Sequence, residues 1–76
     1  MVEIKKQTIM TTKFRIVFVS KTNHVKRITY YGTTIKGAYL TAINYVNDHF
    51  QSAHKFAIYK DEQNGWVTLC KIHILY

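Results

Sequence analysis

The sequence predicts a small α+β domain of ββαββ order, in which two similar hairpins form a four-stranded antiparallel sheet and one helix packs on one face. Three observations lead to this fold. Two stretches with strand-like alternation precede a single stretch with helical spacing, two more strands follow it, and turn residues divide each pair of strands. A chain of 76 residues can close only one hydrophobic core, so we expect a single domain.

The first hairpin is predicted from two alternating stretches. In the run FRIVFV, residues 14–19, every second side chain falls on the same face, and residues 25–31 repeat this pattern. Residues 21–23 form the loop between them. If the asparagine that ends this loop is left-handed, Ile16 pairs with Ile28.

A single helix is predicted over about residues 34–50. Gly32 ends the preceding strand, and the hydroxyl of Thr33 or Thr34 can cap the first turn. Apolar residues then recur at helical spacing. They are Ile35, Ala38, Tyr39, Ala42, Tyr45, Val46 and Phe50.

Two registers are open to the second hairpin, whose last strand covers residues 66–75. A two-residue turn would set Ile58 opposite Lys71 and draw a charge toward the core. A three-residue loop, 63–65, with its glycine left-handed would pair Ile58 with Cys70 and leave the lysine on the far face. We prefer the second register because it buries no charge.

The two hairpins resemble each other in sequence. Lys13-Phe14-x-Ile16 recurs as Lys55-Phe56-x-Ile58, and the same offset aligns the two loops. Two matching hairpins around one helix predict a pseudo-symmetric sheet.

Strand alternation divides the side chains between two faces of this sheet. The face expected under the helix carries Phe14, Ile16, Phe18, Ile28, Tyr30, Phe56, Ile58, Cys70 and Ile72. The face expected to stay open carries Arg15, Val17, Val19, Val25, Arg27, Thr29, Lys55, Ala57, Tyr59, Leu69, Lys71 and His73.

The open face mixes cations with aromatic rings, a combination that suits single-stranded nucleic acid because cations follow phosphates while rings stack on bases. Tyr59 and Tyr31 are the expected stacking platforms. If the sheet instead lies in the groove of a duplex, Lys26 near a hairpin end could hold a phosphate. The competing interpretation is that the valines of this face, with Ala57 and Leu69, form a homodimer seam. The candidate nucleic-acid or partner-binding residues are Arg15, Lys26, Arg27, Tyr31, Lys55, Tyr59, Lys71 and His73.

The charge balance supports an anionic partner. Eleven Lys and Arg against four Asp and Glu give a net charge of +7, which attracts polyanions. Nine of the eleven are lysines, which lack the planar fork that reads bases, so we expect non-specific binding of single-stranded or duplex nucleic acid. The second hypothesis is a small interaction protein that binds and inhibits an acidic host protein. Such a protein could be the product of a phage or mobile element, since the Lys-, Ile-, Asn- and Tyr-rich composition of this chain is typical of small proteins from AT-rich bacteria and their phages.

Catalysis, metal binding and cofactors are not expected. Cys70 and His73 lie three apart on a strand and would face opposite ways, and the adjacent carboxylates 61–62 lie in a solvated hairpin. The glycine-containing segment 32–37 resembles a phosphate cradle but lacks the Lys-Ser/Thr pair of a nucleotide-binding loop, so a turn with a helix cap is favoured.

The remaining features concern location and the chain ends. One cysteine permits no internal disulfide, and neither a secretory leader nor a long apolar run is present, so we expect a cytoplasmic protein that does not enter the membrane. Residues 1–12 are expected to form an arm or a short edge strand, and residues 13–76 the domain. Trp66 is either a lid on the core, which we favour, or an exposed anchor.

Overall fold

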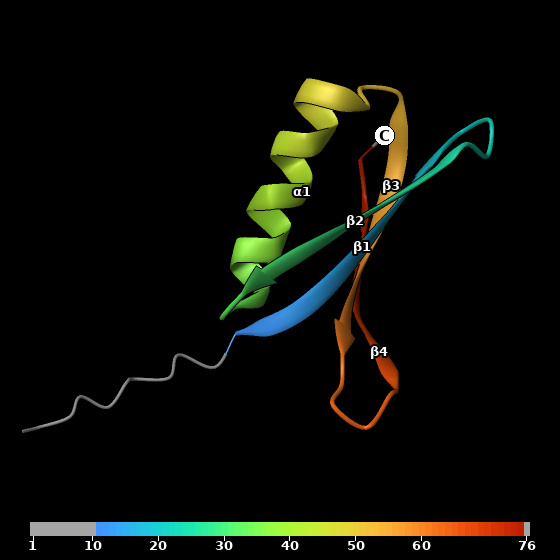
Figure 1. Cartoon of the computed structure of the whole chain (residues 1–76). Helices are drawn as coiled ribbons and strands as arrows, with labels where there is room; N and C mark the ends of the chain where they lie inside the picture. The colour runs from blue at the N-terminus through green and yellow to red at the C-terminus, as the bar shows by residue number, and fades with distance from the viewer. Residues whose placement is uncertain (1–10, 76) are drawn as a thin grey trace, which may run out of the picture.

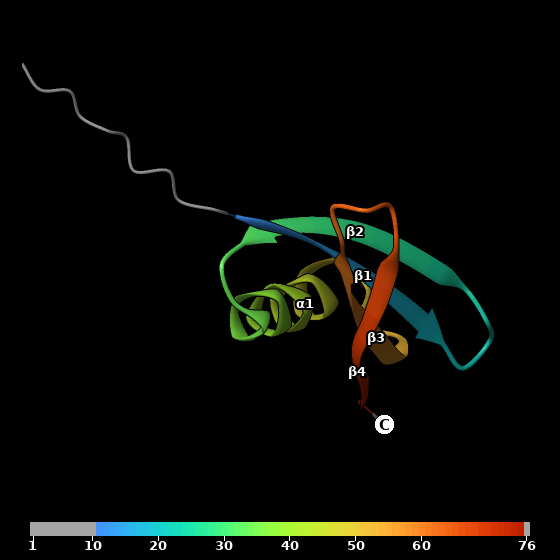
Figure 2. The same cartoon turned by 90° about the horizontal axis from the view of Figure 1, so that it is seen from below.

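The computed structural model describes residues 11–75 and has the predicted ββαββ order. The strands form one open antiparallel sheet in the order β2-β1-β3-β4. The helix lies on one face of this twisted sheet, and no other described element covers the opposite face (Figures 1 and 2). The elements are β1 (Thr12–Ser20), β2 (Val25–Gly32), α1 (Ile35–His49), β3 (Ala53–Asp61) and β4 (Val67–Ile74). The expected arm at residues 1–12 lies outside the described residues except for its end, where β1 already begins.

Both hairpins close with the predicted three-residue loops. The last loop residue is left-handed in each, Asn23 with φ 67° and Gly65 with φ 91°. In the first hairpin the N–H of Ser20 donates to the carbonyl of His24 over 2.9 Å, and the equivalent bond in the second hairpin is 2.8 Å. Because β1 and β3 are antiparallel, the two loops lie at opposite ends of the sheet (Figure 1).

The centre of the sheet reflects the sequence repeat. Ile16 and Ile58, which occupy equivalent positions in the two hairpins, pair directly with each other across the β1–β3 seam. The first strand of each hairpin is therefore central, and β2 and β4 are equivalent outer strands. This is the pseudo-symmetric arrangement that the repeat predicts.

The core lies between the sheet and α1. Ile16, Phe18, Phe56 and Ile58 are essentially inaccessible to solvent. Complete burial of side chains of this size contributes about 1.5–3 kcal/mol each. The helix adds small side chains, Ala38 and Ala42, which let it approach the sheet, and the larger Val46, while Phe50 packs into the core from the C-cap position.

The start of α1 depends on its cap and on two glycines. The N–H of Gly37 donates to Oγ1 of Thr34 over 3.1 Å, which confirms one of the two predicted caps. The ring of Tyr30 lies against both Gly32 and Gly37, in the space that a side chain at either position would need. The glycines are therefore required for packing around this tyrosine.

The register of the second hairpin is only partly as predicted. Next to the loop, Tyr59 pairs with Leu69, as the three-residue loop requires. Cys70 then bulges out of the ladder, so that Ile58 lies opposite Lys71, the pairing that we had rejected. Beyond this bulge every side chain of β4 faces the side opposite to the one expected.

The pairing of Ile58 with Lys71 costs little free energy because β4 is an outer strand of the sheet. The side chain of Lys71 is exposed to solvent, so no charge is buried. His73 packs on the helix side, with its ring centroid 4.7 Å from that of Tyr39 and 4.9 Å from that of Phe56. Desolvation by burial, assisted by the charge of Lys71, lowers the pKa of His73 and so favours the neutral ring.

The bulge also changes which residues of β4 are buried. Ile72, expected in the core, is 51% exposed, and Ile74 is 63% exposed. Cys70 lies only partly buried at the margin of the core rather than inside it. The open face is therefore more apolar along β4 than the sequence suggests.

Candidate nucleic-acid interface

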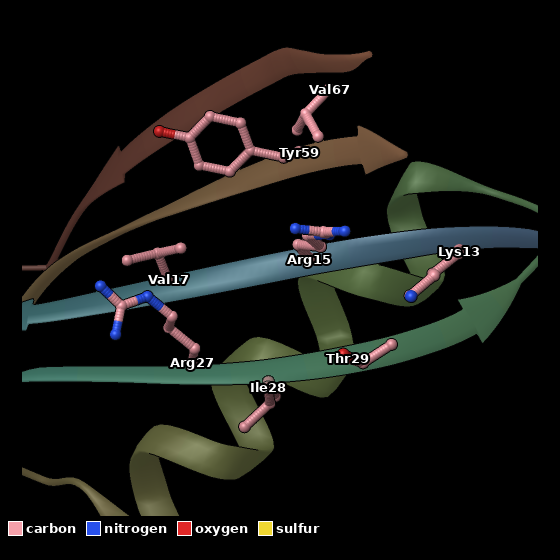
Figure 3. A pocket seen from close by; sticks show the side chains of 8 residues that line it. All are labelled: Lys13, Arg15, Val17, Arg27, Ile28, Thr29, Tyr59 and Val67. Atoms are coloured by element: carbon pink, nitrogen blue, oxygen red, sulfur yellow. The ribbon is translucent and has the colours of Figure 1, made fainter. Parts of the chain in front are cut away.

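The uncovered face of the sheet contains a shallow hollow of about 370 Å³, which we call the cationic hollow. Apart from Ile28, which pairs with the buried Ile16, its lining side chains come from the face opposite the helix, which lies behind the sheet in Figure 3. Strands β1, β2 and β3 contribute most of the lining. The lining residues are Lys13, Arg15, Val17, Arg27, Ile28, Thr29, Tyr59 and Val67.

Strand pairing brings the polar residues of this hollow together. Arg15 on β1 lies directly between Thr29 on β2 and Tyr59 on β3. Two residues farther along β1, Val17 is flanked by Arg27 on β2. Antiparallel partners share a face, so one alternating set of positions from three strands converges here.

A carboxylate at the edge of the cationic hollow holds two of its cations. Oδ2 of Asp61 lies 3.0 Å from Nη2 of Arg15 and 3.7 Å from Nζ of Lys13. One negative charge between two positive ones leaves the group net positive. Arg27 and Lys55 make no ion pair with any residue in 11–75, so their charges are not offset by a neighbouring carboxylate.

A second hollow, of about 190 Å³, adjoins the first, and we call it the apolar hollow. It is lined by Val17, Val19, Lys55, Phe56, Ala57, Tyr59 and Ile72. Val17 and Tyr59 line both hollows and so form the ridge between them. The face thus presents a cationic region and an apolar region on either side of one tyrosine.

Five of the predicted site residues lie on the open face. Arg15, Arg27 and Tyr59 line the cationic hollow, Lys55 lines the apolar one, and Tyr31 lies beyond both, opposite Lys13 and 62% exposed. The alternation of β1, β2 and β3 correctly places all five.

Three predicted site residues lie elsewhere. The bulge turns Lys71 and His73 toward the helix side, so their assignment to the open face was wrong. Lys26 pairs with the buried Phe18 and so belongs to the helix side, although it is exposed at the outer strand. Ile72 and Ile74 take the places on the open face that were assigned to Lys71 and His73.

The structure adds two residues that the sequence did not single out for this face. They are Lys13 and Asp61, which meet across the β1–β3 seam. The hairpin repeat carried the missing signal, because a symmetric seam through Ile16 and Ile58 sets Lys13 beside Asp61.

Trp66 does not close the core. It is 70% exposed at the β3–β4 loop, so its favoured role as a lid was wrong. Its neighbour Val67 lines the cationic hollow. Sequence position alone could not distinguish the two roles, because either requires a tryptophan next to a turn.

The described residues offer little for phosphate-loop or metal chemistry. The ring of Tyr30 occupies the space between Gly32 and Gly37, which favours the turn and helix cap over an anion cradle. Cys70 and His73 both pack on the helix side, so the prediction that they face opposite ways was wrong. Even so, residues 11–75 contain no cluster of three or more His, Cys, Asp and Glu that could bind a metal ion.

Comparison of the chain with protein-family models, curated proteins and solved structures finds no match. The one helix in the described part of the chain is too short and too polar to cross a membrane. Function is therefore inferred from the open face of the sheet.

Proposed function

We propose that this protein is a non-enzymatic nucleic-acid-binding module that holds the strand on the open face of its sheet. The observation that carries the proposal is the cationic hollow, where Lys13, Arg15 and Arg27 surround a surface that also offers the ring of Tyr59. Phosphates need cations, and bases need a flat apolar surface. A cytoplasmic location, where nucleic acid is abundant, fits this role.

The charge distribution favours the sheet over the helix as the binding element. The outer surface of α1 has one lysine and one aspartate, Lys36 and Asp48, and so offers no cationic face to the major groove of a duplex. Both arginines of the chain lie on the open face. The net charge of +7 adds long-range attraction without sequence selectivity.

The proposal is tested by fluorescence anisotropy of a labelled oligonucleotide with nuclease-treated protein. We expect binding at about 50 mM salt that weakens steeply toward 200 mM, because each phosphate contact releases counterions. An Arg15→Gln/Arg27→Gln variant should bind much more weakly and show a smaller salt slope. The control is Lys36→Gln/Lys60→Gln, which removes the same charge from the helix side. Absence of binding by the unmodified protein at the lower salt concentration would refute the proposal.

A second function is favoured by one specific observation, the exposed apolar row on β4. Leu69, Ile72 and Ile74 are each about half exposed or more, and they lie along an outer strand whose backbone can pair with another chain. This surface suits a small interaction protein that inhibits an acidic host factor, or a homodimer. Solution mass with and without nuclease separates these functions: a protein partner or dimer that survives nuclease supports the second one.

A further inference from the structure

We infer that the two hollows bind single-stranded nucleic acid, with a phosphate in the cationic hollow and its base in the apolar hollow against Tyr59. This inference rests on the proposed function and makes it more specific. It assigns different parts of one nucleotide to two adjacent surfaces, and it excludes the intact duplex as the preferred ligand.

The ridge formed by Val17 and Tyr59 separates a cation from a small apolar residue. Val17 pairs with Arg27 on one side and with Ala57 on the other. A line across the sheet therefore runs from a cation, over a valine, to a small apolar residue within two strand spacings, about 10 Å. A nucleotide likewise has a charged end and a flat, largely apolar end.

The lining and the volume of the apolar hollow suit a single base. Its apolar lining consists of the aliphatic side chains of Val17, Val19, Ala57 and Ile72 and of Tyr59, whereas the ring of Phe56 is buried on the helix side. The cation of Lys55 at the margin can reach a neighbouring phosphate. A volume of about 190 Å³ suits one planar base better than a stacked pair. Tyr59 is half-buried and lines both hollows, so it lies at the boundary between them.

Only a single strand offers a phosphate and an unstacked base of the same nucleotide to this face. In a duplex the bases are stacked and paired, so only phosphates and groove edges are available to a flat sheet. A single strand can turn a base outward, and stacking on an aromatic side chain then compensates for the lost base stacking. The apolar hollow would stay empty on a duplex, which would use the cationic hollow alone.

The test compares three fluorescent ligands of equal length with the full chain at about 50 mM salt. They are a mixed-sequence single strand, the same sequence as a duplex, and an abasic single strand. We expect the single strand with bases to bind at least about tenfold more tightly than the abasic strand, because base stacking is lost in the latter. We also expect it to bind more tightly than the duplex.

Two variants locate the base. Tyr59→Leu should weaken binding of the normal single strand by about tenfold while leaving duplex and abasic binding unchanged, and the unchanged binding also shows that the variant is folded. The matched control is Tyr31→Leu, which removes an exposed tyrosine of the same face that lines neither hollow, and it should have a smaller effect.

The outcomes separate the inference from the proposed function. No binding of any ligand would overturn both. Equal binding of all three ligands, or of polyglutamate as tightly as the single strand, would overturn the inference, because the face would then recognise charge alone. An equal loss in the two tyrosine variants would also overturn it, because the hollows would not be the site.

Discussion

The guanidinium of Arg15 donates two hydrogen bonds to the same carboxylate oxygen of Asp61, over 3.2 Å from Nε and 3.0 Å from Nη2. The pair bridges the seam between the two hairpins and orients the arginine at the rim of the cationic hollow. It also places a negative charge beside the proposed phosphate site. An exposed pair of this kind contributes about 0–1 kcal/mol to folding, so its influence on binding can be measured separately.

Asp61→Asn should therefore strengthen nucleic-acid binding. The substitution removes the repulsion between the carboxylate and a phosphate, while the remaining amide oxygen can still accept from Arg15. Affinity should rise at low salt, and the free energy of unfolding should change by less than about 1 kcal/mol. Anisotropy titrations and urea denaturation measure the two quantities. Asp48→Asn, on the outer surface of α1, makes the same change in net charge far from the site. Weaker binding by Asp61→Asn than by this control would contradict the prediction.

The register of β4 can be tested with one conservative substitution made at two positions. Ile58→Val removes a methylene group from a fully buried side chain and should cost about 0.5–1.5 kcal/mol of stability. Ile72→Val makes the same change on the open face and should stay within about 0.5 kcal/mol of the unmodified protein. Urea denaturation of both variants gives the comparison. Equal losses would mean that Ile72 is buried and that the bulge at Cys70 is absent.

His73 should make the fold less stable in mild acid. Its pKa is lowered in the folded state, so below about pH 6.5 the unfolded chain takes up a proton more readily than the folded one. The stabilising effect of the neutral ring is thus complete above that pH. It is lost as the pH falls from about 6.5 through the lowered folded-state pKa.

His73→Phe should remove this acid-side loss, since phenylalanine keeps the ring contacts with Tyr39 and Phe56 and cannot be protonated. Denaturant unfolding at several pH values between 5 and 7.5 measures the effect. The control His49→Gln, at the exposed end of α1, should retain it. An unchanged pH dependence in His73→Phe would assign the loss to another group.

Gly37→Ala should destabilise the protein, although the same change usually stabilises a helix by about 0.5–1 kcal/mol. The added Cβ would clash with the hydroxyl end of Tyr30. Displacing the ring should cost about 1 kcal/mol or more, because overpacking strains its neighbours. In a Tyr30→Phe background, where the clashing oxygen is absent, the cost should be smaller. Thermal or urea unfolding of the single and double variants gives the coupling between these residues.

Most of the fold follows from local sequence signals. The two left-handed loop positions, Asn23 and Gly65, set the hairpin ends, and alternation correctly assigns Arg15, Arg27 and Tyr59 to one face. The bulge at Cys70 has no comparable local signal, because it depends on how an outer strand packs beyond the edge of the helix. Lys71 on an outer strand stays exposed opposite Ile58, so the burial cost that favoured the other register does not arise. The expected faces of His73 and Ile72 were wrong for this one reason.

The part of the candidate site that was predictable is the part that depends on the alternation of side chains along each strand. Asp61 was overlooked because it was considered within its own hairpin, whereas its partners, Lys13 and Arg15, come from the other one. Contacts across the central seam require the pairing of β1 with β3, which no turn fixes. Trp66 was misplaced for a related reason: in so small a domain the core is complete without it.

The central seam also has a kinetic consequence. Each hairpin closes through a short loop, so both can form within microseconds from local contacts. The pairing of Ile16 with Ile58, by contrast, requires segments on either side of the helix to meet, and closing that long loop costs entropy before any core is formed. We therefore expect the docking of one finished hairpin against the other to limit the rate of folding. Substitutions along β1 and β3 should slow folding more than substitutions on the outer strands.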